Sequence, residues 1–525
     1  MTDAAMPDPA MTTAALLRHW AAHRPDHPAV RWGDQQLTYS TLDERSSRVA
    51  NALLASGVGP TERVAFLDKN SPEQFELFFG AAKLNAVPCP VNFRLAPAEI
   101  AVIVKDSGAK VFAVGAEFLP AVESIADELT GTEIVVIGEG SGRPTLTGWR
   151  DSHAADDPRA PQSPGDVAYQ LYSSGTTGRP KGVQLTQANL SAGLSIYPGL
   201  LGMGPESVSM VAMPLYHIGG GGWALAGFTV GATNVLVRDI VPGDLVALVE
   251  LERVSHAFVV PAVLQFMLGV PDVADRDFSA LRYVLYGASP ISEKVLAGSI
   301  RTFRCGFVQA YGLTESTGTV IYLPAADHDP EGPNRHRLRG VGLPIPGTYI
   351  RVVDPAGADV GQGEVGEIWI KGPTVMKGYW NMPEATAETI LPDGWLRSGD
   401  AGFRDADGYL YIHDRVKDMI VSGGENIYPA EVENAIMAHP GVADVAVIGV
   451  PSDKWGETPK AIVVRAPGGD LTEAELLAHC RERLAGFKCP TSVDWVDELP
   501  RNPSGKVLKK DLRAPYWVGR ARMVG

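Results

Sequence analysis

The segment from Tyr172 to Val183 carries the residue types that bind a polyphosphate. It reads YSSGTTGRPKGV, with five hydroxyl-bearing side chains, three glycines and a lysine in twelve residues. Glycines let backbone N–H groups converge on an anion, hydroxyls donate further hydrogen bonds, and lysine adds a positive charge. The candidate phosphate ligands are Ser173, Ser174, Gly175, Thr176, Thr177, Gly178 and Lys181.

This loop is not the common P-loop, which needs a Gly-Lys-Ser/Thr unit, because Pro180 precedes Lys181 here. The apolar run VAYQLY before the loop predicts a strand, and Thr186-Gln187-Ala188-Asn189 after it predicts the start of a helix. From the loop alone, a flexible surface segment is the alternative interpretation.

SSGTTGRPKG resembles the phosphate loop of the adenylate-forming superfamily, which contains acyl-CoA synthetases, adenylation domains of nonribosomal peptide synthetases and firefly-type luciferases. Seven further segments match in the family's order, and the resemblance spans about Thr38 to Leu512. They are Pro214–His217, Tyr286–Pro290, Gln309–Glu315, Trp395–Asp400, Asp414–Asp418, Ser422–Asn426 and Pro503–Lys506. The resemblance implies that a carboxylate attacks the α-phosphate of ATP and that pyrophosphate leaves.

The resemblance also implies the catalytic residues. Lys506 is the cation that bridges the two anionic reactants, and Thr176 and Glu315 are the magnesium ligands, a set of oxygen donors that suits Mg²⁺. His217 lines the passage between the acid pocket and the thiol tunnel and helps to position the carboxylate.

For the nucleotide, the resemblance makes Tyr311 the aromatic face on which adenine stacks. Asp400 accepts hydrogen bonds from the ribose hydroxyls, and Arg415 is a further ribose or phosphate contact. The opposite wall consists of the small residues Gly287, Ala288 and Ser289. The remaining nucleotide contacts are Gln309, Ala310, Gly312 and Thr314.

Lys417 resembles the family's hinge residue. Rotation there would let the tail present Lys506 for adenylation and then a second face for thioester formation. That face would include Gly423 and Gly424, whose missing side chains would leave room for a pantetheine arm.

The acid pocket is expected from Tyr216 to Gly227, from Gly287 onward, and from Thr317 to Ile321, where side chains are mostly small or apolar. A fatty or aryl carboxylic acid fits such a pocket. Trp223 either projects into the pocket and shortens it or packs outward.

The stretch Ser422–Glu433 resembles free-standing acyl-CoA synthetases, also called fatty-acid–CoA ligases, so coenzyme A is the expected acceptor. A separate acyl carrier protein presents the same thiol and is the alternative. A kinase that releases ADP and a non-catalytic ATP-binding protein are the competing classes.

Strand-like runs alternate with helical patterns in the first half of the chain, which predicts parallel α/β layers. Short strand signals with turn residues after Val341 predict a small antiparallel β unit, and the stretch 143–166 reads as a linker or surface loop. We expect an N-terminal adenylation domain (residues 1–414) of two α/β layered subdomains plus that β unit, followed by a small, mobile α+β C-terminal domain (residues 415–525).

The composition limits the function classes. The chain has 525 residues, 45% of them hydrophobic, and a net charge of −15, which argues against broad contact with nucleic acid or anionic lipid. Residues 207–237 lack charged side chains, but the glycine run 219–222 favours a buried pocket wall over a membrane span. Four scattered cysteines suggest no disulfide framework, and we expect a cytoplasmic protein. The oligomeric state stays open, a homodimer included.

Overall fold

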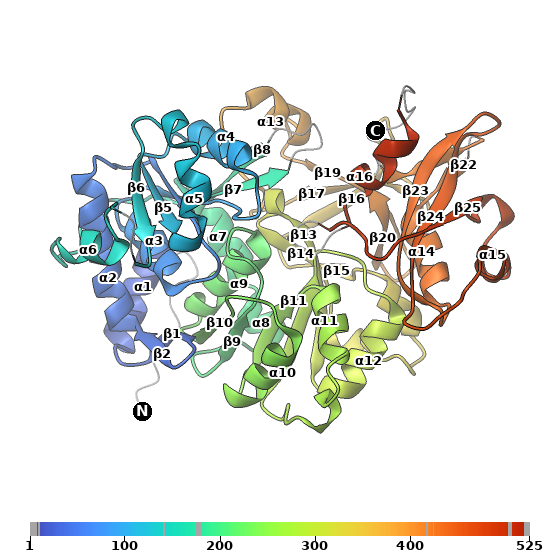
Figure 1. The fold of residues 1–525 in the computed structure, drawn as a ribbon, viewed down its shortest axis with the longest axis horizontal. Coiled ribbons are helices and arrows are strands. Elements are labelled where there is room, and N and C mark those ends of the chain that lie inside the picture. Colours follow the sequence, from blue (N-terminus) through green and yellow to red (C-terminus); the bar gives the residue numbers. More distant parts are fainter. Residues whose placement is uncertain are drawn as a thin grey trace.

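The computed structural model describes Asp8 and residues 11–139, 142–174, 180–415, 418–423, 425–501 and 507–518. The chain folds into a large N-terminal part with four sheets and a smaller C-terminal part with a fifth sheet, which confirms the predicted α/β class (Figure 1).

The first α/β layer surrounds a four-stranded parallel sheet in the order β4-β3-β5-β6. Alternate side chains of β3 enter different cores, with Val64 and Phe66 on one face and Ala65 and Leu67 on the other. Because both faces are buried, helices cover both. The elements are β3 (Arg63–Leu67), β4 (Val87–Pro90), β5 (Val111–Gly115) and β6 (Glu133–Ile137), with α2 (Tyr39–Ala55), α3 (Pro72–Lys83) and α6 (Leu146–Asp151) on the first face and α4 (Pro97–Ser107) and α5 (Leu119–Glu123) on the second.

Helix α6 corrects one sequence prediction. It occupies part of the stretch 143–166 that was read as a linker, and the Thr145 hydroxyl accepts a hydrogen bond from the Gly148 N–H at its start. Leu146 and Trp149 are buried against the sheet. Burial of these two apolar side chains stabilises the helix, although the surrounding sequence is polar and rich in proline.

The second layer is a nine-stranded sheet in the order β15-β14-β13-β12-β11-β9-β10-β1-β2. The adjacent strands β13, β12, β11, β9, β10 and β1 are parallel to one another. β2 at one edge, and β14 and β15 at the other, pair antiparallel. They are β1 (Pro28–Trp32), β2 (Gln35–Thr38), β9 (Val208–Val211), β10 (Thr233–Leu236), β11 (His256–Val259), β12 (Tyr283–Gly287), β13 (Gly306–Leu313), β14 (Gly318–Leu323) and β15 (Leu343–Pro344).

Helices pack against this sheet and around it, and together they form the largest hydrophobic core. α9, which begins with the glycine run, packs against β9, β10 and β11. The helices are α1 (Thr13–His23), α7 (Gln187–Leu194), α8 (Tyr197–Leu201), α9 (Ile218–Thr229), α10 (Pro242–Leu251), α11 (Pro261–Leu268) and α12 (Glu293–Phe303).

Two antiparallel sheets complete the N-terminal part. A three-stranded sheet in the order β18-β8-β7 carries the predicted phosphate loop, and a four-stranded sheet in the order β16-β17-β19-β20 is the predicted β unit. Helix α13 (Pro383–Thr389) follows β18. The strands are β7 (Val167–Ser174), β8 (Pro180–Thr186) and β18 (Gly378–Tyr379), and β16 (Tyr349–Val353), β17 (Gly366–Lys371), β19 (Leu396–Arg404) and β20 (Leu410–Arg415).

The C-terminal part is α+β, as predicted. Its long hairpin of β23 (Val442–Ser452) and β24 (Gly456–Arg465) separates two small cores, because successive side chains of β23 alternate between them. The capping box at Thr472 and Glu475 starts α15, and Pro429 is the first residue of α14. The other elements are β21 (Ile420–Ser422), β22 (Glu425–Ile427), β25 (Ser492–Trp495), α14 (Pro429–Met437), α15 (Glu473–Arg481) and α16 (Lys509–Arg513).

Within the described ranges, no helix combines the length and the apolar character that a membrane crossing requires.

Candidate active site

A cleft of about 2010 Å³ lies between the N-terminal and C-terminal parts. Its N-terminal wall includes the carboxyl ends of β11, β12 and β13, the edge of a parallel sheet at which ligands usually bind. Its other wall includes residues of α14, β23 and α16. Residues far apart in the sequence therefore meet around one space.

The predicted phosphate loop joins two paired strands. Ser174 of β7 pairs with Pro180 of β8, and the Thr186 hydroxyl caps α7 directly after β8, as the sequence predicted. The Ser173 hydroxyl donates a hydrogen bond to Glu315 Oε1 at 3.3 Å, although 142 residues separate the two. The structure thus brings the predicted phosphate loop and the predicted metal ligand together.

Tyr379 connects the same two groups, and no sequence argument identified it. Its hydroxyl donates to Glu315 Oε1 at 3.0 Å, and the Lys181 Nζ lies 4.7 Å from the centre of its ring. The backbone of Tyr379 pairs with Val183 of β8, so this strand pairing fixes the ring beside the loop. The only signal in the sequence was an aromatic pair, Tyr379-Trp380, after a glycine.

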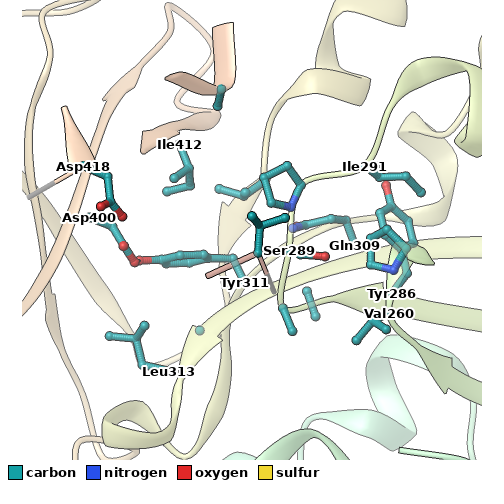
Figure 2. A pocket seen from close by; sticks show the side chains of 18 of the residues that line it. Val260, Tyr286, Ser289, Ile291, Gln309, Tyr311, Leu313, Asp400, Ile412 and Asp418 are labelled. Carbon is teal, nitrogen blue, oxygen red and sulfur yellow. The ribbon is translucent and has the colours of Figure 1, made fainter. Parts of the chain in front are cut away.

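Tyr311 and Asp400, the predicted adenine and ribose contacts, both line the cleft and contact each other. The Tyr311 hydroxyl donates to Asp400 Oδ2 at 2.6 Å. Figure 2 shows Asp400 and Asp418 on one side of the Tyr311 ring, with Ser289 and Gln309 on the side toward Tyr286. Further predicted nucleotide contacts also line the cleft, namely Gln309, Ala310, Gly312 and Thr314.

Two residues of the predicted small-residue wall, Ala288 and Ser289, line the cleft, whereas Gly287 is not among the lining residues. A Cβ on Gly287 would lie 2.1 Å from the Ala310 carbonyl oxygen, so the glycine permits close approach of β12 to β13.

His217 lies at the start of α9 and lines the cleft. Its Nε2 atom is buried and has no hydrogen-bond partner among the described residues, and the same holds for the hydroxyl of Tyr216 and for Gln309 Oε1. Burial, with a smaller effect from the positive charge of Arg94, lowers the pKa of His217 from 6.5 to about 4. The imidazole is therefore neutral at neutral pH, which suits it to hydrogen bonding.

The first two residues of the glycine run lie in the wall of the cleft. Gly219 and Gly220 line the cleft, and a Cβ on Gly220 would lie 2.1 Å from the Pro214 carbonyl oxygen. Trp223 is not among the lining residues. Its indole N–H donates to the Met210 carbonyl at 3.0 Å inside the core.

Thr317 to Ile321, which were expected in the acid pocket, are not among the residues that line this cleft, and the Thr317 hydroxyl donates to the Thr374 carbonyl. The wall instead contains Phe258, Val260 and Pro261. In the sequence, the apolar run followed by proline in HAFVVPAV indicates the end of a buried strand. It does not indicate that this strand end borders a ligand.

Basic residues of the C-terminal part also face the cleft. Arg501 pairs with Asp444 at 2.6 Å, and Lys509 pairs with Glu433 at 2.8 Å. Both residues line the cleft. In the sequence, Arg501 precedes and Lys509 follows the segment that contains Lys506. A third pair joins Arg513 to Asp418.

Gly175, Thr176, Thr177, Gly178, Lys417, Gly424 and Lys506 lie outside the described residues, as do the side chains of Ser174 and Arg415. Gly423 is described. Its φ is +62°, and a Cβ would lie 2.7 Å from the Trp455 ring, so both the backbone conformation and the crowding favour glycine at this position.

The comparison with known proteins agrees with this geometry. The profile described as AMP-binding enzyme matches residues 17–380, and the profile of the AMP-binding enzyme C-terminal domain matches residues 431–506. The chain belongs to the AMP-binding enzyme family.

Two curated members of the family match along nearly the whole chain. A fatty acid–[acyl-carrier-protein] ligase, ScoC of Streptomyces coeruleorubidus, is 41% identical over 512 residues, which cover 96% of each chain. A feruloyl-CoA synthase of an Amycolatopsis species is 41% identical over 507 residues, 95% of this chain and 99% of that one. Among solved structures of the family, the anthranilate CoA ligase AuaEII in complex with anthranoyl-AMP has a TM-score of 0.90 at 28% identity, covering 98% of this chain and 99% of that one.

Membership in the AMP-binding enzyme family decides between the classes that the sequence left open. The chain is an AMP-forming acid–thiol ligase, as its motifs predicted. The kinase and non-catalytic alternatives are set aside.

Proposed function

We propose that the enzyme activates a fatty or aryl carboxylic acid with ATP and transfers the acyl group to coenzyme A. In the first step a carboxylate oxygen attacks the α-phosphorus and pyrophosphate leaves. In the second step the thiol attacks the acyl carbonyl carbon and AMP leaves. The observation that carries the proposal is the cleft itself, where the Tyr311–Asp400 pair and an apolar pocket lie on one continuous surface.

On the nucleotide side, Tyr311 would stack on adenine and Asp400 would bind the ribose, with Arg415 as a further contact. The loop residues Ser173 to Gly178 and Lys181 would bind the phosphates. Ser289 and Gln309 support this assignment because they line the cleft beside the Tyr311 ring (Figure 2).

Glu315 and Thr176 would hold Mg²⁺. Glu315 Oε1 already accepts hydrogen bonds from Ser173 and Tyr379, and no described residue hydrogen-bonds to Oε2. The described residues contain no cluster of three or more acidic, histidine or cysteine ligands. One carboxylate beside a phosphate loop fits Mg²⁺, which takes most of its oxygen ligands from phosphates and water. When bound, the ion would offset the charge of the phosphates.

Lys506 would stabilise the negative charge that develops when the two anionic reactants meet. The ion pairs of Arg501 and Lys509 support this role, because they hold the flanking chain at the cleft. We place the domain boundary between residues 414 and 415, with Lys417 as the hinge. The change of sheet between β20, which ends at Arg415, and β21, which begins at Ile420, supports this boundary.

The acceptor would be coenzyme A, and the feruloyl-CoA synthase relative favours this choice. The carrier-protein ligase relative keeps a separate acyl carrier protein as the second candidate. For the compartment we propose the cytoplasm, because all four cysteines are free thiols.

The test is the release of AMP and pyrophosphate from ATP in the presence of a panel of carboxylic acids, with coenzyme A, with a phosphopantetheinylated carrier protein, or with neither. We expect acid-dependent pyrophosphate release in all three conditions and a thioester product with coenzyme A. Lys506→Ala should reduce acid-dependent release at least about 100-fold, the scale seen when one charge-stabilising donor is removed. Lys454→Ala, an exposed lysine of the same domain, is the control. ADP as the product, or full activity in Lys506→Ala, would contradict the mechanism.

A further inference from the structure

An aromatic side chain lines the acid side of the cleft. Phe258 lies on β11, Val260 follows the last residue of that strand, and both line the cleft. Phe258 comes two residues earlier along the chain, roughly 6–7 Å further from the carboxyl end of the strand, which faces the cleft. Its side chain is 7% exposed.

Gly219 on the facing helix makes room for this ring. A Cβ on Gly219 would lie 2.8 Å from Cε1 of Phe258, closer than real side-chain atoms approach each other. The Phe258 ring therefore occupies the space that a side chain at position 219 would fill. The two positions together close the pocket between β11 and α9.

Trp223 holds the Phe258 ring from behind. The two ring centres lie 6.2 Å apart, and Trp223 is itself fixed by its hydrogen bond to the Met210 carbonyl and by an edge contact with Tyr197 at 5.7 Å. Trp223 is 3% exposed and belongs to the main core. Cores are packed too densely for a ring to move aside without displacing its neighbours, so Phe258 has no room to retreat on that side.

We propose that Phe258, held by Trp223 and accommodated by Gly219, limits the length of the acid, so that the enzyme uses short, medium or ring-bearing carboxylic acids and discriminates against long straight acyl chains. This inference rests on the proposed function and names its substrate class. A ring-bearing acid has an additional contact available, because its edge or face would meet the Phe258 ring in a favourable aromatic geometry.

The experiment measures kcat/KM for hexanoate, cinnamate and hexadecanoate in the full-length enzyme. We expect hexadecanoate to be the poorest of the three. Phe258→Ala should raise the ratio of kcat/KM for hexadecanoate to that for hexanoate by at least about tenfold, because a single methylene in an apolar pocket already changes kcat/KM by about that factor and the substitution removes a whole ring. The ratio is measured within one preparation, so it does not depend on the fraction of folded enzyme.

Two further variants separate pocket length from general damage. Phe303→Ala removes a phenylalanine that is also buried, at 1% exposure, but does not line the cleft, and it should leave the ratio unchanged. Gly219→Leu combined with Phe258→Ala should restore the original ratio, because the new side chain refills the space that the ring vacates. If Phe258→Ala does not fold, Phe258→Leu should shift the ratio in the same direction by a smaller factor.

The outcomes distinguish this inference from the proposed function. If no acid causes release of AMP and pyrophosphate, the proposed function fails. If acids are activated but hexadecanoate is preferred by the wild-type enzyme, or the Phe258 variants leave the ratio unchanged, the length limit at Phe258 is wrong while the function stands. An equal shift in Phe303→Ala would also overturn it.

Discussion

The cleft has a nucleotide half, around Tyr311, Asp400 and Glu315, and an acid half, around Tyr216, His217 and Phe258. The two halves differ in how far their polar side chains are hydrogen-bonded. In the nucleotide half, polar side chains are paired with one another, as in the bonds of Tyr311 to Asp400 and of Tyr379 to Glu315. In the acid half, the Tyr216 hydroxyl and His217 Nε2 are buried without a hydrogen-bond partner among the described residues.

This difference indicates two modes of binding. Paired groups hold their positions before the ligand arrives, which reduces the entropy lost on binding. A buried polar atom without a partner costs about 1–3 kcal/mol, and a ligand that supplies the partner recovers that cost. We infer that the nucleotide half is preorganised and that the acid half becomes fully hydrogen-bonded only with its substrate.

The largest expected effect is at Glu315. Glu315→Gln keeps the shape and an acceptor for Ser173 and Tyr379 but removes the negative charge that would bind the metal. We expect acid-dependent pyrophosphate release to fall by about 100-fold or more, since metal stabilisation of the phosphate charge contributes several kcal/mol. Isothermal titration calorimetry of Mg·ATP should show weaker binding. Glu384→Gln, on an exposed part of α13, is the matched control, and an unchanged Mg²⁺ requirement in Glu315→Gln would remove Glu315 from the metal site.

A smaller effect is expected at Tyr379, which tests whether preorganisation matters. Tyr379→Phe keeps the ring beside Lys181 but loses the hydrogen bond to the Glu315 carboxylate. Such a bond to a charged group contributes about 1.5–3 kcal/mol, so Mg·ATP binding should weaken about tenfold.

The KM for the acid should stay unchanged in Tyr379→Phe, because the ring does not belong to the acid half. The control is Tyr349→Phe at a residue that is 67% exposed. Equal losses in acid and nucleotide binding would show that Tyr379 supports the whole fold and does not position Glu315.

The smallest effect is expected at His217. Because burial lowers its pKa to about 4, the imidazole stays neutral until the pH falls well below the ordinary value of 6.5. His217→Asn should lower kcat/KM for the acid about fivefold, the effect of one neutral hydrogen bond of ~1 kcal/mol.

The ratio of wild-type to His217→Asn kcat/KM should be constant above pH 6.5 and fall only as the pH approaches 4, where the wild-type side chain gains a proton and the asparagine does not. A change in this ratio centred near pH 6.5 would show that His217 titrates normally and works as a proton carrier.

Local patterns in the sequence predicted most of the fold. The strands β3, β5 and β6, the caps at Thr186 and Thr472, and the antiparallel unit after Val341 follow from periodicity and turn chemistry, which depend on neighbouring residues. The main failure was α6, because two buried apolar side chains in a polar stretch give no periodic signal. The site residues were predicted through motifs, and three of them, Tyr311, Asp400 and Glu315, lie around the same cleft, while their roles stay predictions.

The sequence by itself determined the chemistry of this protein. The phosphate loop and the motifs that carry the acidic and aromatic residues are short, continuous segments, so their residue types alone indicate what they bind. Only the tertiary structure decided which side chains complete the site and where the acid pocket ends. Tyr379 reaches Glu315, and Phe258 faces Gly219, through strand pairing and packing between segments tens of residues apart. Such contacts depend on the register of the sheets and the volume left by neighbouring side chains, and neither is written in any local stretch of the chain.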